Sequence, residues 1–335
     1  MSRVEPMSPH ASAPSAPDWR PTASEAALAR RAALLAGARE FFARRGVLEV
    51  ETPLLVGAAV TDVHIHSARV ELEQGSRALY LQTSPEYAMK RLLAAGSGDI
   101  YQIARVVRAG ERSRLHNPEF TLIEWYRRGF SLEALMSEVE ALARELIGAA
   151  ASSLRSEHIA YREAFMQSLN LDPLSAEVKD LERAAARHGY IGSARGERDE
   201  LLDFLMGAVI GPALGLGALT FVHRYPASQA ALAELDPADP RVALRFELYC
   251  EGIELANGFR ELASSPEQRA RFELDRRERA RAGLPVPAID ERLLAALEAG
   301  LPPCSGVALG FDRLLMIALG ARHIDEVLAF PVERA

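Results

Sequence analysis

The sequence predicts an α+β fold in which a mostly antiparallel sheet is flanked by helices. Strand-like runs lie at residues 78–82, 100–107, 120–126, 245–255 and 306–310, and helical patterns separate only some of them. A regular alternation of strand and helix, which would indicate a doubly wound parallel sheet, is not present. The 335 residues suffice to bury a sizeable core.

The N-terminal part is predicted to be a tail followed by a long helix. Residues 1–21 are rich in Ser, Ala and Pro and can bury little apolar surface, so we expect a disordered tail before a single domain at 22–335. Thr22 and Glu25 have the spacing of a capping box, and apolar residues then recur on one helical face as far as Arg45. Pro53 interrupts the strand-like run that follows, which suits a sheet edge.

Further helices are predicted in the middle and the C-terminal third of the chain. Ser131 is placed to cap a helix whose apolar residues share one face. Residues 149–217 indicate helices and polar loops without reactive side chains, and we expect a helical insertion there. Residues 265–282 form a highly charged helical pattern.

The composition argues against several classes of protein. A net charge of −7 disfavours a protein that mainly coats nucleic acid, because phosphate contacts need clustered Lys and Arg. Cys250 and Cys304 are the only cysteines, which indicates neither a disulfide framework nor a cysteine zinc site. No signal-peptide pattern and no membrane-spanning apolar run is present, so we expect a cytoplasmic protein.

The densest chemical signal is a predicted hairpin over residues 105–126, where two strands are joined by a charged loop. Its returning strand places Phe120, Leu122, Glu124 and Tyr126 on one face by the period of two. A carboxylate, a phenol and an aromatic ring on one surface could hold an ammonium group and a purine. An ordinary solvated hairpin face would give the same pattern.

Two glycine-containing segments nearer the C-terminus suggest a phosphate and a metal site. Arg313 follows a glycine-rich strand and could present its planar guanidinium to a phosphate, although it could equally form a structural ion pair. Glu254 and Glu261 are carboxylates of the kind that bind Mg²⁺ beside a triphosphate. Seven residues put them on opposite faces of a straight strand, so convergence requires a bulge or a bend, for which Gly258 is well placed. Ordinary surface acids are the alternative.

Two weaker signals lie before the hairpin. A strand ends at Ser84 and Pro85, and Glu86 could then meet a substrate amine or simply complement a helix dipole. His64 and His66 have a spacing that can ligate a metal on one strand face, but no third ligand is evident, so we expect ordinary strand histidines.

Four segments together resemble class II aminoacyl-tRNA synthetases of the lysyl branch, and the likeness runs from about residue 19 to the end of the chain. The hairpin RVVRAGERSRLHNPEFTLIEWY resembles motif 2, and GVALGFDRLLMIALG resembles motif 3. The segments YCEGIELANGFRELAS and LYLQTSPEYAMKRLL are similar to the stretches that complete that site. Within the branch, the chain most resembles the elongation factor P β-lysine ligase family.

That resemblance implies a class II synthetase catalytic domain that activates (R)-β-lysine with ATP and Mg²⁺ and transfers it to a lysine of elongation factor P. It also implies a homodimer formed through residues 22–53. Three features favour the ligase over a tRNA-charging enzyme. The runs CSGVALGFDR and GIELANGFRELAS are similar to the ligase family's own versions. No anticodon-binding domain is expected before the first helix, so tRNA is not the expected acceptor, and Ala308 replaces the usual glycine of motif 3.

The resemblance also implies the residues of the site. Arg108 and Arg313 would be catalytic, contacting the α- and γ-phosphates, while Phe120 would stack on adenine. The implied ATP-binding residues are Arg108, Glu111, Asn117, Phe120, Glu254, Leu255, Gly310 and Arg313. The implied amino-acid-binding residues are Ser84, Pro85, Glu86, Glu124, Tyr126, Glu261 and Ala308, and the implied Mg²⁺ ligands are Glu254 and Glu261. The family pattern R-x-E is replaced here by Arg-Ala-Gly-Glu, so Glu111 is the candidate for the acid that reads adenine.

Two other functions fit the same motifs. A truncated lysyl-tRNA synthetase would act on RNA, and the absent anticodon domain and Ala308 weigh against it. A non-catalytic amino-acid sensor would not need both Arg108 and Arg313, which are present.

Overall fold

The computed structural model describes residues 19–73, 78–192 and 197–335. Its strands are β1 Leu48–Glu49, β2 Leu55–Val56, β3 Arg69–Val70, β4 Leu79–Leu81, β5 Ile100–Val107, β6 Glu119–Arg128, β7 Arg155–Ala160, β8 Ala218–Pro226, β9 Val242–Cys250, β10 Ile253–Arg260 and β11 Cys304–Gly310. Its α-helices are α1 Glu25–Ala43, α2 Glu86–Ala94, α3 Leu132–Ile147, α4 Tyr161–Leu169, α5 Val178–Arg187, α6 Arg198–Leu205, α7 Ser265–Arg281, α8 Glu291–Gly300 and α9 Phe311–Leu319. The predicted tail lies largely outside the described residues.

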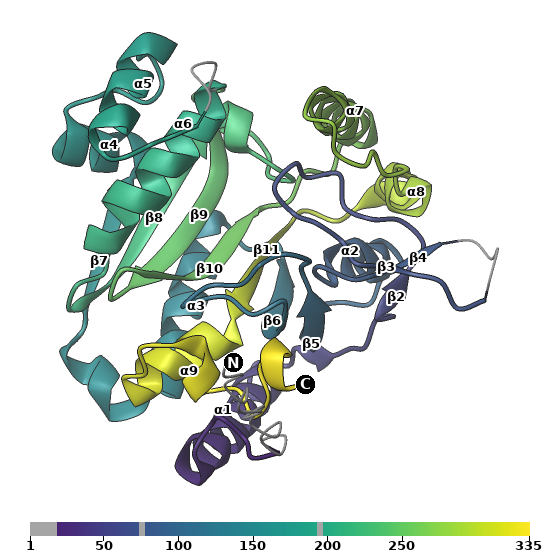
Figure 1. Ribbon diagram of the computed structural model, residues 1–335. Coiled ribbons are helices and arrows are strands. Elements are labelled where there is room, and N and C mark those ends of the chain that lie inside the picture. The colour runs from purple at the N-terminus through teal and green to yellow at the C-terminus, as the bar shows by residue number, and fades with distance from the viewer. Residues whose placement is uncertain (1–18, 74–77, 193–196) are drawn as a thin grey trace, which may run out of the picture.

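An eight-stranded sheet in the order β1-β5-β6-β11-β10-β9-β8-β7 forms the centre of the protein (Figure 1). Its five inner pairings are antiparallel, and only the outermost pairs, β1 with β5 and β7 with β8, are parallel. The predicted α+β class with a mostly antiparallel sheet is therefore confirmed. A second, three-stranded sheet, β2-β4-β3, lies beside it.

One face of the large sheet packs on helices and the other carries polar chemistry. The main core joins α1, α3 and α9 to sheet residues such as Ile123 and Trp125. The alternate residues of β6, Leu122, Glu124 and Tyr126, line a cavity on the opposite face. The predicted division of this strand into two faces is thus confirmed.

The predicted strand at 245–255 was wrong in its extent, because the chain reverses within it. β9 ends at Cys250 and β10 begins at Ile253, so the two form a hairpin with Glu251 and Gly252 at its tip. Both tip residues have a positive φ, of 50° and 71°, as a tight primed turn requires. β7 and β8 were not predicted, and β7 lies within the stretch expected to be helical and polar.

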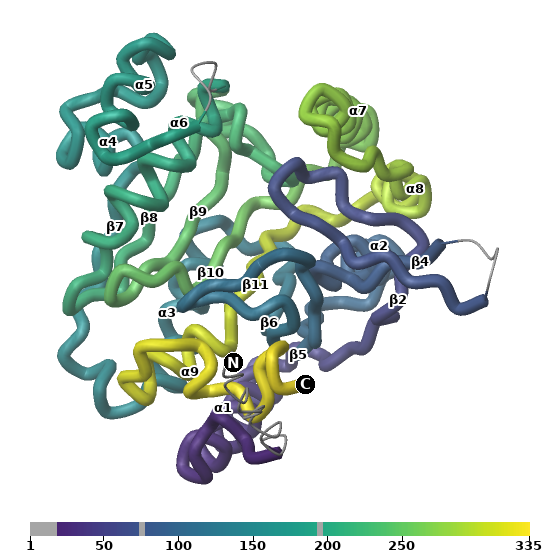
Figure 2. Tube along the Cα trace, viewed as in Figure 1, coloured from purple at the N-terminus to yellow at the C-terminus, as the bar shows by residue number. Residues whose placement is uncertain are grey.

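The helix caps show a second difference. The side chain of Ser24, not Thr22, caps α1 by accepting a hydrogen bond from the backbone N–H of Ala27. The backbone of Thr22 instead donates to the carbonyl oxygen of Ala329, which draws the start of α1 against the C-terminal segment (Figure 2). Ser131 caps α3 as predicted. The run at 47–55 contributes β1 at the sheet edge and β2 in the small sheet.

Residues 155–213 hold their own apolar cluster against β8 and β9. α4, α5 and α6 gather beside β7 and β8 at one end of the sheet (Figure 1). Their core includes Tyr161, Phe165 and Leu202, packed on Val222 and Tyr225. Among the described residues, no helix is both long and apolar enough to cross a lipid bilayer.

Candidate active site

A cavity of about 310 Å³ opens on the polar face of the large sheet. It is lined by β6, β10 and β11, by the start of α2 and by the loop that joins β5 to β6. All but one of the residues implied by the sequence resemblance line it: Ser84, Glu86, Arg108, Glu111, Asn117, Phe120, Glu124, Tyr126, Glu254, Leu255, Glu261, Ala308, Gly310 and Arg313. The exception is Pro85, which lines a neighbouring cavity of about 280 Å³ behind α2.

One end of the cavity gathers positive charge. Arg108 follows β5 and lies over the ring of Phe120, with its guanidinium carbon 5.2 Å from the ring centroid. Arg313, in the first turn of α9, donates to the carbonyl oxygen of Glu254 over 2.9 Å. Both side chains are about one-quarter exposed or less. Two partly buried guanidinium groups of this kind form an anion-binding site.

His116 joins this end and was missed in the sequence. Its Nε2 lies 2.6 Å from an Arg313 nitrogen, and its Nδ1 lies 2.7 Å from the hydroxyl of Ser113. Burial and the charges of Arg313 and Arg108 lower the pKa of His116 to about 4, so the ring is neutral at neutral pH. Because arginine only donates, Nε2 accepts and Nδ1 carries the proton.

The opposite end of the cavity gathers carboxylates around a buried lysine. Lys90 Nζ lies 2.7 Å from a Glu86 oxygen and 2.5 Å from a Glu261 oxygen. Glu124 accepts hydrogen bonds from Ser84 Oγ at 2.8 Å and from the Tyr126 hydroxyl at 2.7 Å. Three carboxylates thus face a single fixed ammonium group.

Burial sets the protonation of these groups. Burial and the nearby charge of Glu86 raise the pKa of Glu124 to about 7, although the hydrogen bonds from Tyr126 and Ser84 oppose the shift. Burial likewise raises the pKa of Glu261, against the opposing charge of Lys90. For Lys90 itself, burial alone would lower the pKa, but the charges of Glu261 and Glu86 outweigh it and raise the pKa. Lys90 therefore stays charged, and a cationic ligand would favour ionisation of Glu124.

Lys90 was also missed in the sequence. It lies four residues after Glu86, the spacing at which helical side chains meet, so the start of α2 gave a usable signal. Its second partner, Glu261, is far away in the sequence and only the fold brings the two together.

The floor of this end depends on a glycine. Gly306 lies opposite Tyr126 in the β6–β11 pairing. A Cβ atom there would lie 2.3 Å from the Tyr126 ring and 2.4 Å from a Glu261 oxygen, which no side chain could occupy without a shift. Ala308 pairs with Glu124 on one side and Asn257 on the other, and it lies on the cavity floor.

Glu254 and Glu261 both line the cavity, but the predicted bulge does not lie at Gly258. The register between β9 and β10 shifts between Glu254 and Ala256, which leaves Leu255 as the extra residue. Gly258 serves close packing instead, because a Cβ there would lie 2.7 Å from the Phe246 ring.

The two carboxylates lie at opposite ends. Glu254 has an oxygen 3.5 Å from Arg313, whereas Glu261 pairs with Lys90. Seven residues of strand span roughly 20 Å at about 3.3 Å each, so the pair cannot hold one ion. The charge that most affects Glu254 is that of Glu247 on β9, which raises its pKa together with burial.

The predicted histidine pair does not lie on a strand. His64 and His66 occupy the loop between β2 and β3, and His64 approaches Asp203 of α6 at 3.8 Å. Within the described ranges, no group of three or more His, Cys, Asp or Glu side chains is placed to hold a metal ion.

Comparison with known proteins identifies the family. Residues 15–334 match the family model described as tRNA synthetases class II (D, K and N). The curated elongation factor P–(R)-β-lysine ligase of Proteus mirabilis is 52% identical over 325 residues, covering 95% of this chain and 98% of that protein. The chain belongs to the elongation factor P–(R)-β-lysine ligase family. The ligases named for Vibrio cholerae, 52% identical over 325 residues, and Haemophilus influenzae, 48% identical over 321 residues, cover 95% of the chain each and 99% and 98% of their own lengths.

Membership of the ligase family gives the two ends of the cavity a chemical context. A class II synthetase domain joins a nucleotide to an amino acid, so one site must accept an anionic phosphate chain and an amino acid together. In this protein, the guanidinium groups of Arg108 and Arg313 and the carboxylates of Glu124 and Glu261 lie at different ends of one cavity.

Proposed function

We propose that this protein activates (R)-β-lysine with ATP as the aminoacyl adenylate and transfers it to a lysine side chain of elongation factor P. The observation that carries the proposal is the cavity with guanidinium groups at one end and a surplus of carboxylates at the other. The names of its relatives support the choice of amino acid and acceptor.

The carboxylate end supports a substrate with two ammonium groups. In the part of the chain that the structure describes, Lys90 pairs with Glu86 and Glu261, and Glu124 has only neutral donors, which leaves negative charge for a dicationic ligand. Buried carboxylates bind cations strongly because few water molecules compete with them. An amino acid with a neutral side chain would leave part of this charge unpaired.

The guanidinium end supports ATP as the activating substrate. We propose that Arg108 contacts the α-phosphate and Arg313 the γ-phosphate, with adenine against Phe120 and its amine near Glu111. Asn117, Leu255 and Gly310 would complete the nucleotide site. The substrate carboxylate, already ionised, attacks the α-phosphorus in line, and pyrophosphate leaves with the electrons of the broken P–O bond. This step needs positioning and charge neutralisation rather than a general base.

We propose that Mg²⁺ accompanies ATP at Glu254, on the side of Glu247. Burial raises the pKa of Glu254, and among the neighbouring charges that of Glu247 contributes most to the rise, while Arg313 lies 3.5 Å from a Glu254 oxygen. Carboxylates beside a triphosphate suit Mg²⁺, which would neutralise phosphate charge there. Glu261, paired with Lys90, would belong to the amino-acid end instead.

In the second half-reaction, the acceptor lysine must first lose a proton, because an unperturbed lysine has a pKa of about 10.4. Its neutral amine then attacks the adenylate carbonyl, an amide bond forms, and AMP leaves. Ala308 on the cavity floor would narrow the amino-acid end relative to glycine and favour the β-amino substrate.

We further propose a cytoplasmic homodimer in which residues 22–53 form the interface. Leu48, on the edge strand β1, is 56% exposed, and Leu54 is 46% exposed, so apolar surface is available beside α1. We propose that residues 149–217 form an insertion in the catalytic domain and that tRNA is not a substrate. Sedimentation as a monomer at micromolar concentration would contradict the dimer.

The test is ATP–pyrophosphate exchange with (R)-β-lysine and α-lysine at matched concentrations, followed by transfer to purified elongation factor P measured as a mass increase. Faster exchange with (R)-β-lysine and a single β-lysyl addition are expected. Preference for α-lysine together with charging of tRNA would instead assign a tRNA synthetase, and binding without exchange would assign a sensor.

A further inference from the structure

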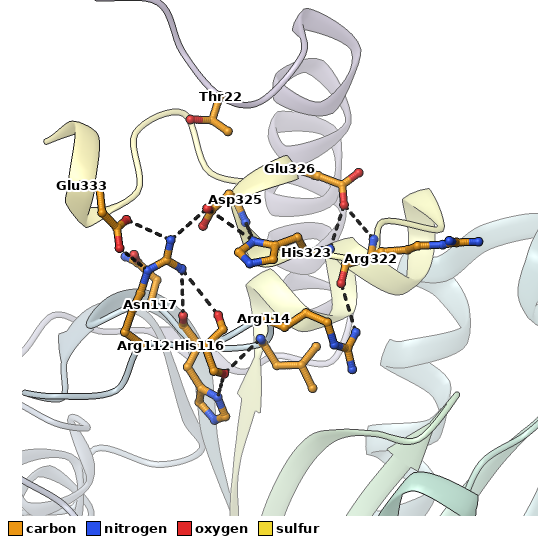
Figure 3. A network of polar contacts seen from close by, with 12 residues as sticks. Thr22, Arg112, Arg114, His116, Asn117, Arg322, His323, Asp325, Glu326 and Glu333 are labelled. Atoms are coloured by element: carbon orange, nitrogen blue, oxygen red, sulfur yellow. Dashed lines mark hydrogen bonds and ion pairs between the residues drawn. The ribbon is translucent and has the colours of Figure 1, made fainter. Parts of the chain in front are cut away.

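The loop that joins β5 to β6 is held from outside the cavity by the C-terminal segment of residues 322–334. This loop carries Glu111, His116 and Asn117, which all line the guanidinium end. Between them lies Arg112, whose side chain points to the C-terminal segment (Figure 3). We propose that Arg112 is a positioning residue, through which the C-terminal segment fixes this loop for ATP.

Arg112 forms a fork on two acids of the C-terminal segment. Its Nε and Nη2 donate to the two carboxylate oxygens of Glu333 over 2.5 and 2.9 Å. Nη2 also donates to Asp325 over 2.9 Å. Only a planar guanidinium can make this bidentate contact and reach a second carboxylate at the same time.

The remaining nitrogen of Arg112 turns back to its own loop. Nη1 donates to the carbonyl oxygen of His116 over 3.3 Å and approaches that of Ser113 at 3.5 Å. The ring of His116 in turn contacts Arg313. An unbroken series of contacts therefore runs from Glu333 through Arg112 and His116 to the guanidinium proposed for the γ-phosphate.

Backbone contacts hold the same two segments together on either side. The side-chain oxygen of Asn117 accepts from the backbone N–H of Val332 over 3.1 Å. The N–H of Ile324 donates to the carbonyl oxygen of Arg114 over 2.9 Å, and Arg114 donates to the carbonyl oxygen of Arg322 over 3.0 Å (Figure 3). The loop is thus held to the C-terminal segment by Arg112, Arg114 and Asn117.

The expected effect is on ligand geometry rather than on stability. Arg112 and Glu333 are 28% and 54% exposed, and ion pairs at such exposure add little to folding stability. Ligand affinity is more sensitive to such contacts. A loop that is not held in place before binding must become ordered when the ligand binds, and the free energy of that ordering lowers the affinity. Small displacements of such groups also slow the reaction.

The test compares Arg112→Met and Arg112→Lys with the unchanged protein, using the dissociation constant for ATP from calorimetry. This readout rests on ATP binding alone and does not depend on which amino acid or acceptor the protein uses. Arg112→Met is expected to weaken ATP binding about tenfold, the cost of ordering one or two side chains. Arg112→Lys keeps the positive charge but cannot make the bidentate contact. On a logarithmic scale, we expect its loss of ATP affinity to be more than half of the loss in Arg112→Met.

The matched control is Arg241→Met, which removes another bidentate arginine, paired with Asp239 over 2.8 and 2.9 Å in the turn before β9. Neither residue lines the cavity, so this variant is expected to bind ATP normally. Glu333→Gln is expected to reproduce part of the Arg112→Met effect and to add nothing to it in the double variant. An unchanged ATP dissociation constant in Arg112→Met, or full rescue by Arg112→Lys, would overturn the proposal.

Discussion

Replacing Lys90 by Met tests the charge balance at the carboxylate end. The change removes a buried ammonium group that is 1% exposed and lies 2.5 Å from Glu261 and 2.7 Å from Glu86. Removing one partner of a buried ion pair typically costs about 3–5 kcal/mol, because the other charge is left without compensation. Met fills similar space, so the loss reflects charge rather than a cavity. At pH 9 we expect a decrease in the free energy of unfolding that approaches this size, and at pH 7, where Glu261 can keep a proton, a smaller decrease.

The pH dependence separates charge from packing. With Lys90 present, burial still raises the pKa of Glu261 to about 8, and removal of Lys90 raises it further. A carboxyl group whose pKa is raised in the folded state loses stability as pH rises towards that pKa. Above pH 8, Glu261 no longer lowers the stability of the unchanged protein as pH rises. In the variant, where its pKa is higher, Glu261 should continue to lower the free energy of unfolding by up to about 1.4 kcal/mol per pH unit.

Urea unfolding at pH 7 and pH 9 measures both effects. The control is Lys179→Met, the same substitution at an exposed pair with Glu177, which should change stability by no more than about 1 kcal/mol. The double variant Lys90→Met/Glu261→Gln should recover much of the loss, because the uncompensated charge is gone. At pH 9, a cost below about 1 kcal/mol for Lys90→Met, or no recovery in the double variant, would refute the reasoning.

Three further predictions concern the cavity. Arg313→Ala should keep the fold, since Arg313 is not part of the hydrophobic core, but lower pyrophosphate exchange by about a hundredfold or more; near-normal exchange would remove Arg313 from the phosphate site. Gly306→Ala should raise the KM for the amino acid and cost about 1–3 kcal/mol through overpacking, whereas Gly310→Ala, where the nearest atoms are 3.7 Å away, should fit far more easily. Because the pKa of Glu124 is about 7 and an ammonium ligand binds its ionised form, the KM for the amino acid should rise up to about tenfold per unit as pH falls below 7, and a flat profile would contradict this assignment.

Local patterns predicted the parts of the site that lie within one element. The period of two in β6 placed Phe120, Glu124 and Tyr126 on the cavity face, because a strand alternates its side chains regardless of its neighbours. Arg313 was predicted to lie beside the cavity because it follows the glycine-rich end of a strand, and it does lie in the first turn of α9, directly after β11. Such assignments depend only on backbone geometry that the sequence itself determines.

Features that depend on two distant segments could not be predicted in the same way. The bulge at Leu255 is a property of the pairing between β9 and β10, whereas the sequence of β10 alone favoured a bulge at Gly258. Thr22 does not cap α1, since its backbone N–H is bonded to Ala329 at the other end of the chain. The 245–255 run contained the Glu251–Gly252 turn, but its apolar residues continued on both sides and obscured it.

The β5–β6 hairpin carries both a residue proposed to bind ATP, Arg108, and a residue proposed to bind the amino acid, Glu124. Arg108 stands where β5 ends, and Glu124 lies on β6 opposite Gln102, so the hairpin register fixes the separation between the guanidinium and the carboxylate. Among the three carboxylates, Glu124 has only the neutral donors Ser84 and Tyr126, whereas Glu86 and Glu261 are already paired with Lys90. Glu124 is therefore the carboxylate best placed to select a cationic side chain. Lys90 compensates only part of the negative charge of the three carboxylates, so a ligand with two ammonium groups would be favoured over one with a single ammonium group.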